Sequence, residues 1–141
     1  MIIQGQTTAF KQNLLSGLEN FAVGTPYTYK IALYDAMASL DNSTISYTTT
    51  NEVVGTGYTT GGEILTVIPP TSSTSANTAW VSFANVTWSP ASFTTRGALI
   101  YNATTGAAVC VLNFGSDKTA TGSFTIQFPT ADATNAILRI S

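Results

Sequence analysis

The sequence GALIYNATTGAAVCVLNF, at residues 97–114, is the most informative structural signal in the chain. Gly97–Tyr101 and Ala107–Phe114 are short apolar runs typical of strands, and Asn102–Gly106 between them has the composition of a hairpin connection. Antiparallel sheets usually leave one face to water, but these two runs are apolar on both faces. The stretch therefore predicts a hairpin that is covered on both sides.

Residues 8–21 provide a candidate for one of these covers. Their apolar side chains recur at helical spacing, with Thr7 or Thr8 as the N-cap. The stripe consists of Phe10, Leu14, Leu15, Leu18 and Phe21. A helix this short needs a surface to lie on, and Gly17 within it costs up to about 1 kcal/mol relative to Ala. We therefore expect the helix to pack on the outer face of a sheet, with Leu14 buried there.

Other short runs predict the remaining strands. They lie at 27–35, 64–68, 79–83, 86–88, 124–128 and 136–140, separated by turn-forming residues. The segment 69–77, which begins with two prolines, is expected to be an exposed loop. About eight short strands favour an antiparallel β-sandwich or jelly roll with one N-terminal α-helix packed on a sheet. We expect one such domain over residues 7–141, preceded by an extended arm at residues 1–6.

The glycine-rich segment NEVVGTGYTTGGEIL, at residues 51–65, resembles a phosphate-binding loop only superficially. Thr60 stands where a dinucleotide fingerprint needs its third glycine, and Glu63 stands where a P-loop needs lysine. A strand-like run follows instead of a helix. The glycines are therefore interpreted as turn residues with positive φ, and the loop at Tyr58 is a candidate contact with a neighbouring subunit.

The composition leaves little material for catalysis. The chain has no histidine, which excludes Ser-His-Asp and Cys-His mechanisms and most zinc and copper sites. Cys110 is the only cysteine, and its apolar surroundings indicate a buried, inert thiol. No spacing pairs two carboxylates as acid and base, and Gly115–Lys118 is interpreted as a turn rather than a calcium loop. We expect no enzymatic activity, no cofactor and no metal site.

The charge pattern bears on the partners. The 141 residues include only 9% charged side chains, against roughly 25% in typical soluble domains. The net charge is −2 and there is no basic run, which disfavours direct contact with nucleic acid. No apolar stretch is long enough for a membrane span, and the first residues lack the pattern of a secretory signal. A lightly charged surface suits a protein that is packed against partners, and it also suits a hydroxyl-rich extracellular sandwich.

Several apolar and aromatic side chains are candidates for such contacts. Ile2 and Ile3 lie outside the helix and lack a local partner, so the arm is expected to reach a neighbouring subunit. Trp80 alternates away from Val81 and Phe83, which leaves three options: cover by a loop, a protein contact, or a platform for a sugar ring. Tyr34 is also expected to face outward. The candidate interface residues are Met1, Ile2, Ile3, Tyr34, Tyr58 and Trp80.

The chain also resembles a family of small proteins of tailed bacteriophages. The resemblance is carried by the strings TYKIALYDAMASLD, YTTTNEVVGTGYTTGG, VTWS, TTRGALIYNATTG, VCVLNFGSDKTATGSFTIQFP and NAILRIS, which together span nearly the whole chain. It implies a β-sandwich or jelly roll that acts as a cement or decoration protein on the outside of the virion head. The implied partners are the major capsid protein and further copies of the chain, as a homodimer or trimer. Synthesis would take place in the cytoplasm of the bacterial host. The alternative is a carbohydrate- or receptor-binding module on a tail or neck.

Overall fold

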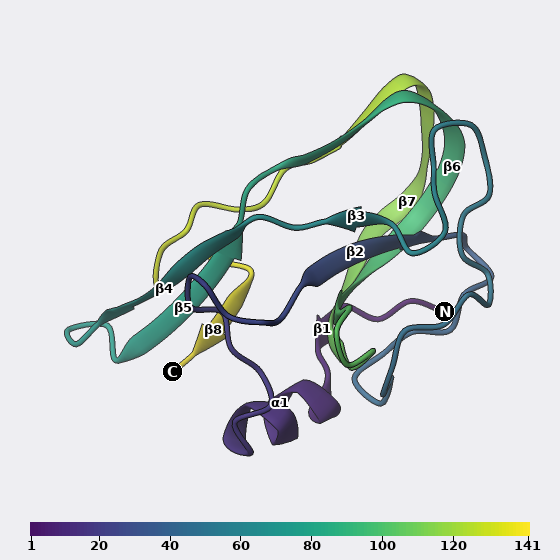
Figure 1. Ribbon diagram of the computed structural model, residues 1–141. Helices are drawn as coiled ribbons and strands as arrows, with labels where there is room; N and C mark the ends of the chain where they lie inside the picture. The colour runs from purple at the N-terminus through teal and green to yellow at the C-terminus, as the bar shows by residue number, and fades with distance from the viewer.

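The computed structural model describes residues 1–141 and consists of two antiparallel sheets and one helix (Figure 1). In chain order the elements are β1 (Gly5–Gln6), α1 (Thr8–Leu15), β2 (Tyr29–Tyr34), β3 (Glu63–Ile64), β4 (Val67–Ser73), β5 (Thr78–Phe83), β6 (Val86–Asn102), β7 (Ala108–Ile126) and β8 (Leu138–Ile140). The larger sheet has the order β1-β7-β6-β2-β3, and the smaller has the order β4-β5-β8. The predicted mostly-β sandwich with an N-terminal helix is confirmed.

The central hairpin, β6–β7, is much longer than predicted. Each strand joins two of the predicted runs, and Figure 1 shows the paired ribbon bending over the top of the molecule. Register shifts between Trp88 and Ala91, and again between Thr95 and Gly97, are bulges that bend and twist such a ribbon. The predicted turn at 115–118 is wrong, because this segment belongs to β7 and Asp117 lies 3.1 Å from the Arg96 guanidinium.

The predicted cover on both faces of the hairpin is confirmed. On the inner face, Ala98 and Ile100 join the main core, to which both sheets contribute. On the opposite face, Leu99 and Val111 pack in a second cluster. That cluster is completed by Ile2, Ala32, Tyr34, Ala38, Leu40, Tyr101 and Ala108. The outer cover is therefore the N-terminal segment and the loop after β2, not the helix as expected.

Helix α1 is shorter than its apolar stripe. Thr7 is the N-cap, and its Oγ1 accepts a hydrogen bond from the Phe10 amide at 3.1 Å. Gly17, with φ of 73°, ends the helix, and its amide donates to the Leu14 carbonyl. The Leu18 amide donates to the Asn13 carbonyl, which completes a Schellman motif. Of the predicted stripe, only Phe10 and Phe21 are buried.

The first residues do not form an arm that reaches away from the domain. The Met1 ammonium donates to the Ala38 carbonyl at 2.8 Å, and Ile2 is only 6% exposed and bridges to Leu40. Strand β1 then pairs with β7. The segment is extended, as predicted, but Ile2 finds its partners in its own chain because the second cluster needs a cover.

The prolines at 69 and 70 lie in a strand rather than in the predicted loop. They belong to β4, an edge strand, where the missing backbone donors disturb no further pairing. The register shifts between Ile68 and Thr71, so the prolines fall at a bulge. The single strand predicted at 64–68 is also wrong, because the chain passes there from β3 of the larger sheet to β4 of the smaller one.

Candidate interaction surfaces

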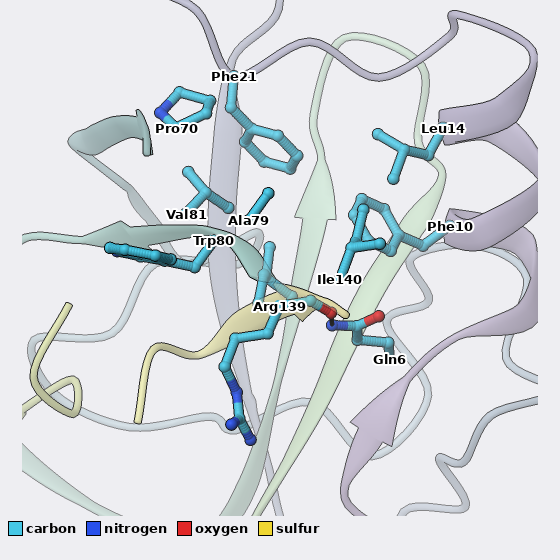
Figure 2. A pocket seen from close by; sticks show the side chains of 11 residues that line it. Gln6, Phe10, Leu14, Phe21, Pro70, Ala79, Trp80, Val81, Arg139 and Ile140 are labelled. Carbon is cyan, nitrogen blue, oxygen red and sulfur yellow. Dashed lines mark hydrogen bonds between the residues drawn. The ribbon is translucent and has the colours of Figure 1, made fainter. Parts of the chain in front are cut away.

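An apolar groove lies between α1 and the three-stranded sheet. We call it the α1 groove; its volume is about 130 Å³. Its lining residues are Gln6, Phe10, Leu14, Phe21, Pro70, Ala79, Trp80, Val81, Leu138, Arg139 and Ile140. Figure 2 shows Phe10 and Leu14 projecting from the helix toward Phe21 and Ile140. The guanidinium of Arg139 points away from this wall, so the concave surface is almost entirely apolar.

A second groove, of about 220 Å³, adjoins the first and shares Phe21 with it. It is lined by Asn20, Phe21, Ala22, Val23, Gly24, Thr25, Tyr27, Tyr29 and Val67. Phe21 stacks on Tyr29 with ring centroids 4.4 Å apart and meets Phe10 edge-on at 6.0 Å. These aromatic contacts fix the wall between the two grooves.

Two leucine side chains near these grooves are exposed to solvent. Leu15 is 91% exposed and Leu18 is 51% exposed. Leu15 is the last residue of α1, and the Schellman turn at Gly17 redirects the chain before Leu18. We call the two grooves together with Leu15 and Leu18 the helix face. Eleven residues line the first groove and nine line the second, with Phe21 common to both, so the helix face has twenty-one residues.

Further large apolar side chains are exposed on the loop after β2. Met37, Ile45 and Val54 are 79%, 73% and 94% exposed, and Met1 nearby is 81% exposed. We call the loop at 35–62 and the first three residues the loop side. In Figure 1 these segments lie at the right, away from β4, β5 and β8 at the left. The apolar surface is thus divided between two parts of the molecule.

The loop side is held in shape by a buried carboxylate. Glu52 accepts hydrogen bonds from the hydroxyls of Tyr47 and Tyr58, both at 2.6 Å, and from the Gly61 amide at 2.7 Å. The Tyr58 hydroxyl also accepts from the Leu33 amide at 2.9 Å. Burial and the hydrogen bond to Glu52 raise the pKa of Tyr58. The Tyr58 hydroxyl is therefore engaged in hydrogen bonds within the domain, where it holds the loop in place, and is not free to bind a neighbouring subunit.

The glycines of this loop serve close packing, as the turn interpretation implies. Gly57 has φ of 84°, and a Cβ there would lie 1.8 Å from the Pro90 carbonyl oxygen. Gly62 has φ of 77°, and a Cβ there would lie 1.8 Å from the Ile31 carbonyl oxygen. The loop passes directly against the backbone of β2 and β6 at these two positions.

The structure separates the six predicted interface residues. Tyr34 is fully buried, contrary to expectation, and its hydroxyl donates to the Thr48 carbonyl at 2.6 Å. Ile2 is buried too, whereas Met1 and Ile3 are exposed. Trp80 is half-buried at the α1 groove. The helical spacing predicts that Leu15 and Leu18 are buried, but both are exposed. For Leu18 the sequence holds a signal, because Gly17 before it is a typical helix terminator.

Two other buried groups have catalytic side-chain types. Glu19 accepts hydrogen bonds at Oε2 from the Tyr29 hydroxyl at 2.7 Å and from the side-chain Nδ2 of Asn102 at 3.2 Å, while its Oε1 has no partner. Burial raises the pKa of Glu19, and it raises the pKa of Cys110 to about 12. Both groups are packed in the interior. No group of three His, Cys, Asp or Glu side chains in residues 1–141 is placed to hold a metal ion, and no helix is long and apolar enough to cross a membrane.

Comparison with protein-family models, curated proteins and solved structures finds no match to this chain.

Proposed function

We propose that this protein is a structural virion protein that binds the outside of a phage head and bridges adjacent major capsid subunits. The observation that carries the proposal is the division of exposed apolar side chains between the helix face and the loop side. Clustered apolar surface on a protein marks sites of association. A bridging protein needs two such sites, because it must hold two neighbours at the same time.

The rigidity of the loop side supports a mechanical role. Three hydrogen bonds to Glu52 fix the loop, and the glycines at 57 and 62 seat it against the sheet. Contacts of standard size, repeated over a lattice, resist internal pressure together even when each one is modest. Few charges are available to be screened, so binding to the shell should depend weakly on salt.

The experiment is to add the purified protein to heads assembled without it and to follow DNA loss on heating or osmotic shock. The wild type should bind and raise the threshold for DNA loss. Val54→Asp should bind at least about 10-fold more weakly, because it places a charge on the loop side. Ser75→Asp, in the exposed turn between β4 and β5, is the matched control and should bind like the wild type. Absence of binding, or equal binding of both variants, would contradict the proposal.

A second candidate function is suggested by Trp80. Its indole is half-buried at the α1 groove, and Arg139 is its cross-strand partner on β8. An indole face beside a hydrogen-bond donor can hold a sugar ring, as in a receptor-binding module of a tail or neck. Trp88 is only 2% exposed, so a fluorescence change on adding host surface glycans would report mainly on Trp80. A saturable change that Trp80→Phe removes would favour this function; no change would disfavour it.

A further inference from the structure

We propose that residues 16–28, which connect α1 to β2, form a strap that opens when Glu19 loses its proton. We call this segment the strap. While the Glu19 carboxyl is protonated, the strap lies against the domain. When the proton passes to solvent, the strap detaches and Phe21 leaves its place between the two grooves. This inference concerns the chain by itself and does not depend on the proposed role on the shell.

The strap is attached to the domain at few points. None of residues 19–27 takes part in a backbone–backbone hydrogen bond. Of the whole strap, only the side chains of Glu19 and Phe21 are buried. Strand β2, which follows, pairs with β6 along its whole length. Segments with few backbone hydrogen bonds and few buried contacts are those that open locally while the rest of a domain stays folded.

Phe21 is the attachment that does not respond to pH. Its ring stacks on Tyr29 and meets Phe10 and Phe83 edge-on, with ring centroids 6.0 and 6.2 Å away. In Figure 2 the ring points from the strap into the α1 groove. Because Phe21 lines both the α1 groove and the second groove, its departure would join the two grooves.

Glu19 is the attachment that responds to pH. Its side chain is only 6% exposed, and its buried Oε1 has no hydrogen-bond partner. No cation neutralises it, because the only ion pair in residues 1–141 joins Arg96 to Asp117. A buried carboxylate without a cation is costly, whereas a protonated carboxyl is less so. Ionisation therefore disfavours the closed strap, and opening returns the carboxylate to water.

The groups that face Glu19 from the two neighbouring strands do not compensate for its charge. Asn102 of β6 is a neutral amide. Tyr29 of β2 can titrate, but burial and the hydrogen bond to Glu19 raise its pKa, so it stays neutral in acid and at neutral pH. Burial outweighs the hydrogen bonds from both and raises the pKa of Glu19. The closed strap thus holds the proton more tightly than the open one, and opening becomes easier as the pH rises above the ordinary value of 4.5.

The test is amide hydrogen exchange measured by NMR from pH 4 to 7 and expressed as protection factors, which remove the intrinsic effect of pH on exchange. The reporter is the Asn20 amide, which donates to the Tyr29 hydroxyl at 3.0 Å. Its protection should fall as the pH rises, by up to about 10-fold per pH unit, the limit for release of one proton. The Ile31 amide, within β2, should stay more protected than Asn20 at every pH.

Two variants assign the effect to Glu19. Glu19→Gln keeps the shape of the side chain but cannot ionise, so the protection of Asn20 should no longer depend on pH. Glu63→Gln is the matched control: it makes the same change at an exposed carboxylate in β3 and should keep the pH dependence of the wild type. A wild type with constant protection, or equal pH dependence in the two variants, would overturn the proposal. So would equal protection of Asn20 and Ile31, because the strap would then open only when the whole domain unfolds.

A second measurement needs no substitution. The carboxyl carbon of Glu19, followed by NMR in the wild-type protein, should titrate above pH 4.5, since the closed strap retains the proton. Titration at or below 4.5 would overturn the proposal, because the closed strap would then hold the ionised carboxylate without cost. Neither measurement involves phage heads, so the strap and the role on the shell fail separately.

Discussion

Replacing Gly57 by alanine should destabilise the protein more than the same change at Gly24. The two glycines have nearly the same backbone conformation, with φ of 84° and 82°. At Gly24 nothing lies within 4 Å of the position a Cβ would take. At Gly57 the Cβ would lie 1.8 Å from the Pro90 carbonyl oxygen and 3.1 Å from the Ala91 Cα. The pair therefore separates backbone strain from close packing.

The magnitudes follow from these distances. Left-handed backbone costs a residue with a Cβ about 1–2 kcal/mol, and this should be the whole effect at Gly24. Overpacking adds about 1–3 kcal/mol where neighbouring atoms must move. At Gly57 those neighbours are backbone atoms of β6, which cannot rotate aside. We expect a loss of about 1–2 kcal/mol for Gly24→Ala and about 2–5 kcal/mol for Gly57→Ala.

Urea unfolding followed by tyrosine and tryptophan fluorescence measures both values, and thermal unfolding provides a second reading. At this chain length about 1 kcal/mol corresponds to roughly 3–4 °C in Tm. Equal losses in the two variants would refute the reasoning, because the loop at Gly57 would then not be seated on β6.

Three further predictions concern buried and half-buried side chains. Burial raises the pKa of Glu19 in the folded chain, so the protonated carboxyl contributes stability that is present below the ordinary pKa of 4.5 and is lost as the pH rises above it. Glu19→Gln should therefore flatten the decline of the free energy of unfolding between pH 4 and 7. Phe10→Ala should cost about 3–5 kcal/mol in chemical unfolding, whereas Leu14→Ala, at a half-buried position, should cost less than the 2–5 kcal/mol typical of a buried leucine; equal losses would contradict the helix placement. Tyr58→Phe should cost about 1–3 kcal/mol and speed hydrogen exchange of the Gly61 amide, because Glu52 loses one of its donors. Unchanged exchange would show that the Tyr58 hydroxyl does not hold the loop in place.

The parts of the fold that could be predicted from the sequence are those with local patterns. The central hairpin was predictable because both faces of residues 97–114 are apolar and a turn lies between them. The middle of β7, residues 115–123, was not, because Thr119 and its neighbours are polar and are held by cross-strand partners such as Thr94, whose hydroxyl lies 3.0 Å from that of Thr119. Tyr34 was misplaced because alternation indicates that a face exists but not which distant loop covers it.

The candidate surfaces show the same limit. Met1 and Trp80 could be proposed from their type and position, and both are at least partly exposed. The exposure of Leu18 could not be predicted, because its spacing continues the helical stripe past the point where the helix ends; Leu15, the last residue of α1, has the same stripe spacing and is exposed as well. The division of the exposed apolar surface into two regions depends on how the loop after β2 folds back onto the sheet. No periodicity in the sequence predicts the path of that loop.

The pairing of β1 with β7 has a consequence for synthesis on the ribosome. Gly5 in β1 pairs with Val111, and Ile31 in β2 pairs with Ile100. Both strands therefore pair with segments that are synthesised much later. The smaller sheet likewise needs β8 at residues 138–140. The larger sheet cannot form before β6 and β7 have been synthesised, and until then the only sheet partner available to the apolar strand β2 is the two-residue strand β3. Contacts this distant in sequence also favour slow folding, so the hairpin β6–β7 is the unit on which the earlier segments assemble.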